Sequence, residues 1–221
     1  MSAAVTAPPP PVIDQGGLGQ PVEGALVVTR RRIDQVLVAA GLVVAVALAA
    51  ASGLLMWGSN FSKEYVRDEL TAQKVFFPDA AALNAEGRTD LLGYAGRQVT
   101  SGDDAQAYAG YIDHHLARIA NNQTYAELGT IERAAKAEVV AATTAKQPAD
   151  QIAVLQTKAS AITGQRDTLF KGETLRGLLL STYAWWTIGT VAWVAAIVSA
   201  IAAIAMLLLT VMGFIHLRRF R

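Results

Sequence analysis

The sequence predicts an all-α protein in which two transmembrane helices flank an extracytoplasmic bundle of about four helices. Two apolar stretches, Val36–Trp57 and about Ile188–Phe214, contain no charged residue. Each is long enough to cross the hydrocarbon core, which takes about 20 helical residues. Apolar residues recur at helical spacing in the segment between them. One arginine cluster precedes the first stretch and another follows the second, so that each lies between an apolar stretch and the nearer end of the chain.

The apolar stretches divide the chain into five expected segments. Residues 1–29 hold five of the seven prolines and predict a disordered cytoplasmic tail. Its four-proline run either docks in an aromatic groove of a partner or is simply solvated. The other segments are a first transmembrane helix, an extracytoplasmic helical domain, a second transmembrane helix and a basic cytoplasmic end, at residues 33–57, 58–182, 183–214 and 215–221.

The arginines predict which way the chain faces. Arg30, Arg31 and Arg32 precede the first apolar stretch, and Arg218, Arg219 and Arg221 follow the second. Lys and Arg next to a span are retained in the cytoplasm, so we expect both termini there. The alternative for the first stretch is a cleaved signal peptide, whose apolar region is shorter, at about 7–15 residues.

Local signals predict where the helices of the middle segment begin and end. We expect the first helix to continue past the membrane to about Phe76–Pro78, because no breaker precedes Pro78. A loop with one short helix around Asp90–Gln98 follows. The next two helices open at Ser101/Asp104 and at the capping box Thr124/Glu127.

The last helix is expected to start near Ala149. Apolar residues from Ile152 to Leu169 alternate at spacings of three and four, which is typical of a coiled-coil seam. Glycines farther along make a break near Lys171–Glu173 possible, since each glycine weakens a helix by up to about 1 kcal/mol.

Small residues in both spans predict helix–helix contact, within the chain or with a partner, because they let backbones approach closely in lipid. They repeat every fourth residue: Gly41, Ala45, Ala49 and Gly53 in the first span, Ala192, Ala196 and Ala200 in the second. Aromatic residues at the outer ends of the spans predict an interfacial belt. These are Trp57, Tyr183, Trp185 and Trp186, with Trp193 nearby.

Candidate chemistry is sparse in this sequence. The chain has no cysteine, so thiolate metal sites and disulfides are excluded. Asp113, His114 and His115 point about 100° apart on a helix and cannot converge on one ion. We expect His115 on the apolar face and His114 toward solvent. No nucleophile motif or phosphate loop occurs, so we expect no enzyme activity, no catalytic residues, no metal and no cofactor.

Three segments resemble one known family. Val66–Pro78, Tyr108–Leu128 and Leu169–Leu180 are similar to a group of uncharacterised two-pass membrane proteins of actinobacteria, over about residues 33–205. The resemblance implies a bacterial plasma-membrane address and no settled activity. Members are sometimes labelled aromatic ring-opening dioxygenases, a label that the absent non-haem iron ligands do not support here.

The sequence leaves three function classes open. We expect a non-catalytic integral membrane accessory or scaffolding subunit of a bacterial envelope, respiratory or transport complex. Its partners would be membrane lipid and other membrane protein subunits, with no nucleic acid. The alternative is a sensor-like ligand-binding bundle that acts through a separate partner, because little chain remains for an output domain. An enzyme is the third class and lacks a visible active site.

Overall fold

The computed structural model describes residues 30–219, and within that range it is helical, with no strand. The all-α class is therefore confirmed for these residues. The predicted cytoplasmic tail, residues 1–29, lies outside the described residues. The elements are α1 (Arg30–Gln73), α2 (Ala80–Ala85), the 3₁₀ helix η1 (Thr89–Tyr94), α3 (Gly102–Ile119), α4 (Tyr125–Thr144) and α5 (Ala149–Arg219).

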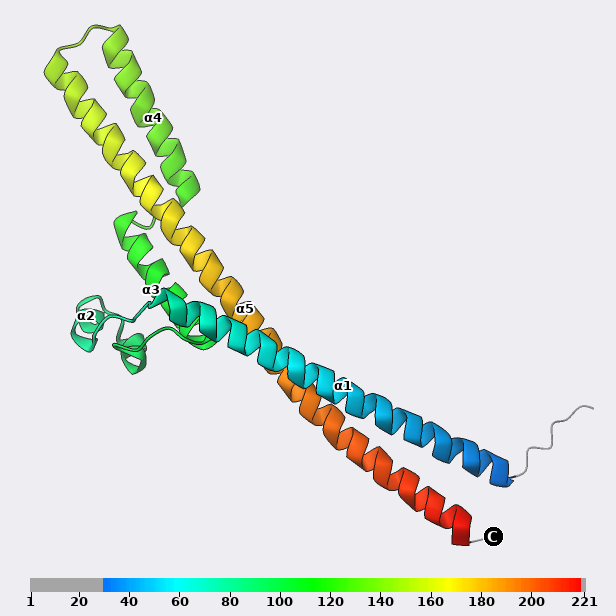
Figure 1. The fold of residues 1–221 in the computed structure, drawn as a ribbon. Coiled ribbons are helices and arrows are strands. Elements are labelled where there is room, and N and C mark those ends of the chain that lie inside the picture. The colour runs from blue at the N-terminus through cyan, green and yellow to red at the C-terminus, as the bar shows by residue number, and fades with distance from the viewer. Residues whose placement is uncertain (1–29, 220–221) are drawn as a thin grey trace, which may run out of the picture.

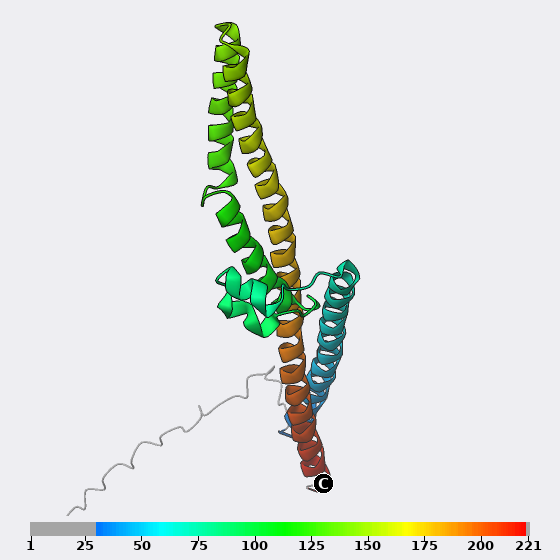
Figure 2. The ribbon, with the colours of Figure 1, turned by 90° about the vertical axis from the view of Figure 1, so that its left-hand side faces the viewer.

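Helix α5 is the spine of the molecule. Its 71 residues span about 106 Å at 1.5 Å per residue. Helices α4, α3 and α1 pack along it one after another, from its first residue to its last (Figures 1 and 2). The predicted bundle of about four helices is not confirmed, because these helices share α5 as their common partner rather than surrounding one core.

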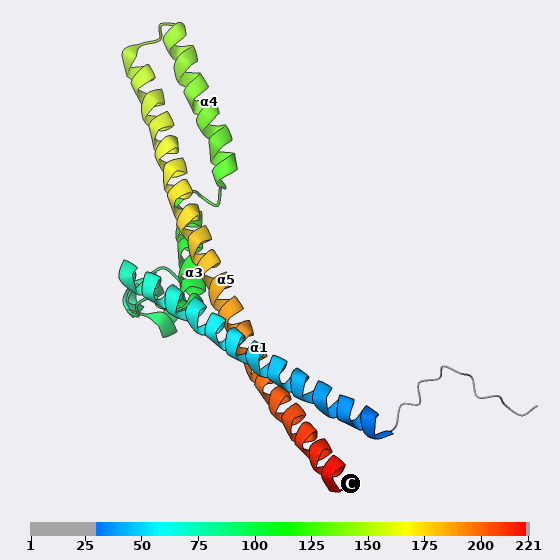
Figure 3. The ribbon, with the colours of Figure 1, turned by 45° about the vertical axis from the view of Figure 1, so that its right-hand side comes forward.

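Helices α1 and α5 run side by side in opposite directions (Figures 1 and 3). Both continue without interruption from their apolar parts into the rest of the molecule, as the sequence predicts for α1. The far half of α5 forms an antiparallel hairpin with α4, the tip of which lies at the opposite end from the chain termini (Figure 1).

The predicted helix starts are confirmed by their caps. At α3, the Ser101 hydroxyl accepts a hydrogen bond from the Asp104 amide at 3.1 Å. At α4, Thr124 and Glu127 form a complete capping box, which satisfies two amides that have no partner inside the helix. Asn121 ends α3 with a φ of 51°, a left-handed conformation that asparagine tolerates well.

The possible break near Lys171–Glu173 does not occur, because α5 is continuous there. Gly172 has a packing reason instead. A Cβ atom on this residue would lie 2.4 Å from Cδ2 of Leu116 in α3. Only glycine therefore permits α3 to approach α5 this closely.

The segment between α1 and α3 differs from the prediction of one short helix around Asp90–Gln98. The short helix η1 lies at the predicted place, although it ends four residues sooner, and a second short helix, α2, forms earlier in the chain. Asp79 starts α2 by accepting a hydrogen bond from the Ala82 amide at 2.8 Å, a cap that directly follows Pro78. Helix α2 was missed because this cap was not recognised.

Two clusters of buried side chains hold together residues 58–182, the part of the molecule beyond the apolar segments, which we call the outer domain. The first joins the end of α1, the segment with α2 and η1, and α3 to α5; it comprises Val66, Leu70, Phe77, Leu83, Leu91, Val99, Ala105, Ala109 and Leu179. The second, Leu116, Ala120, Leu128 and Leu169, lies where α3, α4 and α5 meet. Together they attach the short helices to the spine.

Candidate functional site

Two hydrogen bonds fix the level of α1 against α5. The Ser52 hydroxyl donates to the Ala196 carbonyl at 2.8 Å, and the Ser62 hydroxyl donates to the Trp185 carbonyl at 2.8 Å. Counting residue for residue from Ser52 and Ala196, Val36 is level with residue 212 and Trp57 with residue 191. The two apolar stretches therefore lie at the same level over about 33 Å. That length suits a hydrocarbon core of about 30 Å.

The contact between α1 and α5 is a seam of small side chains. Its fully buried members include Ser59 and Ala196, both 0% exposed. Seam residues recur at intervals of seven, with Ala45, Ser52 and Ser59 on α1 and Gly189, Ala196 and Ala203 on α5. This interval is the repeat of a left-handed coiled coil.

The structure brings some of the predicted packing residues into this seam and leaves others outside it. A Cβ atom on Gly41 would lie 2.7 Å from the Thr210 hydroxyl oxygen, and Ala45 is buried. Ala49 and Gly53 are exposed. Each four-residue step turns about 40° beyond a full circle, so a ridge with that spacing rotates off the seam. Contact of Ala49 and Gly53 with a partner stays a prediction.

On α5 the same drift is visible around Ala196. This residue is fully buried, whereas Ala192 and Ala200 on either side are half-buried. Sequence reasoning missed several seam residues: Ser52, Ser59, Gly189, Ala203 and Gly213. Small residues spaced seven apart were the signal that could have found all of them except Gly213.

The outer faces of the helix pair are covered with exposed apolar side chains, among them Leu54 at 70% and Val43 at 68% exposed. In the most apolar window of each helix, only 6% of residues in α1 and 11% in α5 are buried. A core helix of a soluble protein buries its apolar face. Both helices are long and apolar enough to cross a membrane.

The predicted topology arginines gather at one end of the pair. Arg32 on α1 and Arg218 and Arg219 on α5 are exposed there, where the first and last helices end together (Figure 1). The Arg218 guanidinium lies 4.6 Å from the centroid of the Phe214 ring. The side chains of Arg30, Arg31 and Arg221 are not among those that the structure describes.

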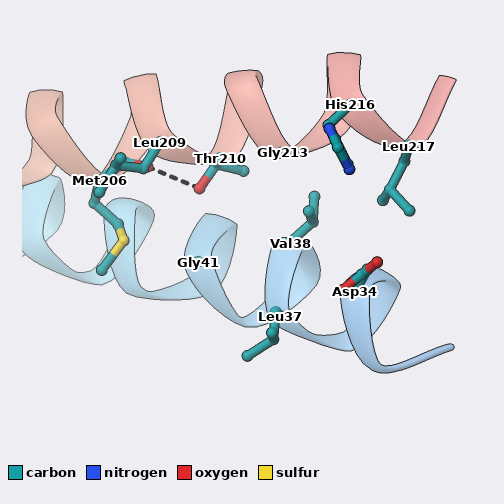
Figure 4. A pocket seen from close by; sticks show the side chains of 10 residues that line it. All are labelled: Asp34, Leu37, Val38, Gly41, Met206, Leu209, Thr210, Gly213, His216 and Leu217. Atoms are coloured by element: carbon teal, nitrogen blue, oxygen red, sulfur yellow. Dashed lines mark hydrogen bonds between the residues drawn. The ribbon is translucent and has the colours of Figure 1, made fainter. Parts of the chain in front are cut away.

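A groove opens between α1 and α5 next to these arginines (Figure 4). Its volume is about 320 Å³, and its lining consists of Asp34, Leu37, Val38, Gly41, Met206, Leu209, Thr210, Gly213, His216 and Leu217. Asp34 and His216 lie at the end of the groove nearest the chain termini, and Met206 lies at the other end. The groove is thus apolar along its length and polar at its mouth.

The predicted belt residues lie at the opposite end of the apolar segments. Trp57 and Trp185 are exposed, and the Trp57 ring stacks on Phe61 with centroids 5.8 Å apart. Trp186 also packs against the start of α3. A Cβ atom on Gly102 would lie only 2.2 Å from Cβ of Trp186, so the start of α3 rests directly on this tryptophan. Tyr183, one turn away, is half-buried.

Two buried carboxylates of the outer domain are engaged in structural contacts. The Glu132 carboxylate, between α4 and α5, accepts hydrogen bonds from Lys136 at 2.6 Å, Thr163 at 2.7 Å and Arg166 at 2.8 Å. The bond from Lys136, followed by those from Thr163 and Arg166, lowers the pKa of Glu132 to about 2. Such a carboxylate is a weak base at neutral pH. It is better suited to fixing the register of the two helices.

A second buried carboxylate, Asp104, secures the start of α3. Its side chain is 3% exposed and lies 2.9 Å from the Arg97 guanidinium. It also accepts a hydrogen bond from the Thr100 amide at 3.2 Å. The sequence marked Asp104 as a helix-capping position, but nothing in it indicated the ion pair with Arg97.

The histidine placement expected from the sequence was wrong. His115 is exposed, whereas His114 is half-buried with Nε2 3.1 Å from the Glu86 carbonyl oxygen. The buried face of α3 passes through Ala109 and Leu116, and His115 lies off it. Among residues 30–219, no group of three or more His, Asp or Glu side chains could hold a metal ion.

These residues define a class: an all-helical protein with two antiparallel helices apolar enough to cross a membrane and an elongated domain at one end of them. No protein-family model, curated protein or solved structure matches the chain. The resemblance to actinobacterial two-pass proteins therefore stays an expectation from the sequence.

Proposed function

We propose that this protein is a non-catalytic accessory or scaffolding subunit of a complex in a bacterial plasma membrane. The observation that carries the proposal is the common level of the two apolar segments, which lie side by side with their large side chains facing outward. Two such helices form one apolar band of about the thickness of a bilayer core. Outside a membrane, water would have to solvate this whole apolar surface.

The proposed orientation has both termini in the cytoplasm and residues 58–182 outside. Arg32, Arg218 and Arg219 at one end of the band support it, because basic residues next to a span are retained on the cytoplasmic side. The antiparallel arrangement of α1 and α5 places the whole outer domain at the other end (Figure 1).

The shape of the outer domain supports a scaffolding role. From Trp186 to its first residue, Ala149, α5 extends about 55 Å from the proposed membrane surface, and α3 and α4 pack along this part. An unbroken helix keeps each attached surface at a fixed height above the bilayer. The buried carboxylates Asp104 and Glu132 are held by structural partners, which favours a role in binding over one in catalysis.

The orientation can be tested with single cysteines, since the natural chain has none. Ser160→Cys lies at an exposed position of α5 near the hairpin tip, and Ser2→Cys lies in the N-terminal segment. A membrane-impermeant maleimide added to intact cells should label the first and not the second. Labelling of Ser2→Cys alone would reverse the topology, and labelling of both only after lysis would place the protein off the plasma membrane.

The scaffolding role is tested by gentle detergent extraction of the full chain. We expect a membrane protein partner to co-purify in a fixed ratio. Removal of exposed α4 side chains, for example Val140→Ser, should reduce that ratio if the hairpin holds the partner, because Val140 is 65% exposed. A lone monomer that keeps its fold in the same extract would contradict the scaffolding role.

A sensor is the second candidate, and one cavity favours it. A space of about 500 Å³ lies where α3, α4 and α5 meet, lined in part by Asp113, Tyr125, Leu169 and Glu173. Ligand cavities combine apolar walls with a few polar groups in this way. A small molecule that raises the melting temperature of the full chain in detergent, and fails to do so after Leu169→Trp, would favour sensing over scaffolding.

A further inference from the structure

The groove of Figure 4 lies in the part of the helix pair that faces the cytoplasm in the proposed topology. Its apolar walls include Leu37 on α1 and Leu209 on α5, both inside the level apolar segments. Its mouth, with Asp34 and His216, lies at their edge. In a bilayer the groove would therefore run from the headgroup region into the acyl-chain region of the inner leaflet.

The walls suit an alkyl chain. Apart from Asp34 and His216 at the mouth, the polar side chain in the lining is Thr210, whose hydroxyl donates to the Met206 carbonyl at 2.8 Å. The inner part of the groove consequently offers an occupant only apolar contact. An alkyl chain needs nothing else, whereas any polar group placed there would lose its hydration without compensation.

The groove is large enough for an alkyl chain. Its wall on α1 runs about 10 Å from residue 34 to residue 41, and its volume is about 320 Å³. Several methylene groups fit into that space. A helix of a second copy would also present apolar side chains to these walls, so the charge at the mouth decides between the two occupants.

The charge at the mouth indicates the headgroup. Three exposed arginines lie at this end of the helix pair, Arg32 on α1 and Arg218 and Arg219 on α5. Asp34 is the acidic residue in the lining, and His216 faces it from α5. The balance is strongly positive, and arginine binds phosphate oxygens in a fixed two-pronged geometry. Basic pockets at this depth favour anionic lipid headgroups.

We infer that the groove between α1 and α5 is a binding site for an anionic phospholipid, with one acyl chain along Leu37 and Leu209 and its phosphate at the arginines. The inference rests on the proposed topology, because only then does the groove face the inner leaflet. It gives the helix pair a specific lipid partner in addition to bulk lipid.

The headgroup half of the site is tested with the full chain in mild detergent and fluorescent phosphatidylglycerol. Replacing Arg32, Arg218 and Arg219 together by glutamine should weaken binding about tenfold or more, since each arginine attracts an anionic headgroup. The matched control replaces three exposed arginines of the outer domain, at positions 67, 118 and 133, and should bind as the natural chain does. Equal losses in both triple variants would overturn the inference.

The acyl half is tested by filling the groove. Leu37 is 63% exposed at the groove wall, so Leu37→Trp can cover the groove without entering the seam. We expect a clear loss of labelled lipid, whereas Leu54→Trp, on the same helix but outside the groove, should bind normally. If Leu37→Trp binds lipid as the natural chain does, the inference is overturned. If Leu37→Trp instead turns a dimer into a monomer in light scattering and leaves lipid binding unchanged, the occupant of the groove is a second copy of the chain.

Three competitors identify the ligand. Unlabelled phosphatidylglycerol should displace the probe, and phosphatidylcholine should not. Inorganic phosphate, which has the charge without the chain, should fail at concentrations where the lipid succeeds; efficient displacement by phosphate would show a free-anion site instead. The cysteine labelling described above reports the topology independently. Correct topology with no anionic preference rejects only the lipid site, whereas reversed labelling rejects the proposed orientation.

Discussion

Gly172→Ala tests the packing of α3 against the spine. In the natural chain the side chain of Leu116 covers Gly172, and an added Cβ would lie 2.4 Å from its Cδ2 and 2.9 Å from its Cγ. Leu116 is only 6% exposed and belongs to a buried cluster with Leu128 and Leu169. It therefore cannot swing away without displacing its neighbours.

The expected magnitude follows from two opposing effects. In an exposed helix interior, alanine is more stable than glycine by about 1 kcal/mol. Forcing a methyl group into a packed site has the opposite effect and costs about 1–3 kcal/mol. Gly172→Ala should thus destabilise the attachment of α3 by about 1 kcal/mol. Gly177→Ala is the matched control on the same helix. Nothing lies within 4 Å of its Cβ position, so it should stabilise by about 1 kcal/mol.

A double-mutant cycle with Leu116→Ala isolates the contact. Leu116→Ala should cost about 2–5 kcal/mol by itself, but it removes the atoms that Gly172→Ala would strike. In that background Gly172→Ala should become stabilising by about 1 kcal/mol. The coupling between the two positions is then about 2 kcal/mol, within the usual range for residues in contact.

Hydrogen exchange of the α3 amides, measured by mass spectrometry on the full chain in detergent, reports local opening of this helix. Gly172→Ala should accelerate exchange across Gly102–Ile119, and Gly177→Ala should not. If Gly172→Ala slows exchange as much as its control does, or if the cycle shows no coupling, the close approach of Leu116 to Gly172 is refuted.

Three further predictions concern the outer domain. Because hydrogen bonds lower the folded pKa of Glu132 to about 2 from 4.5, its contribution to hairpin stability is complete above about pH 4.5 and lost as the pH falls through about 2. Acid titration followed by circular dichroism should show this loss, and Glu132→Gln should flatten it. Gly102→Ala should release the start of α3 from Trp186, at a cost of about 1–3 kcal/mol, because both Cβ atoms, 2.2 Å apart, are fixed by their backbones; tryptophan emission should shift. Thr124→Ala should cost about 1 kcal/mol and accelerate exchange in the first turn of α4, with the rest of that helix unaffected.

Features that depend on neighbouring residues could be predicted from the sequence. Ser101 and Thr124 cap their helices as expected, since a cap joins groups within three residues of each other. The seam along Ile152–Leu169 was also predicted, and half-buried and buried positions on α5 follow it. The missed helix α2 belongs to the same class, because the cap at Asp79 was available in the sequence.

Features that depend on distant residues could not be predicted in this way. From the sequence alone, Gly172 indicates a possible helix break. Its packing role depends on Leu116, which lies on another helix and covers it. The apolar faces of α3 and α4 likewise predict that each packs on something, and they do not say on what. Both meet α5, which is long enough to serve them in turn, so no compact bundle is needed.

The buried face of α5 shows where its surroundings change. In the outer part its buried residues include the large Leu169 and Leu179 as well as Ala159, whereas farther along they are all small, at Gly189, Ala196 and Ala203. The exposed residues change as well. In the outer part charged side chains stand among them, whereas from residue 188 to residue 214 there is no charged residue and large apolar side chains such as those at positions 201 and 208 are exposed. In water, burial of apolar area stabilises a contact by about 25 cal/mol per Å². In lipid that gain disappears, and close approach between small residues replaces it.

Because α5 is one continuous helix, its backbone geometry cannot account for this change in buried and exposed residues, and a change of solvent can. The change in residue type occurs between Leu179 and Gly189, at the level of Trp186. The apolar stretch of α1 ends at Trp57, which the hydrogen bond between Ser52 and Ala196 places level with residue 191, within about two turns of Trp186. Packing on one helix and composition on the other thus support the same outer boundary of the proposed membrane.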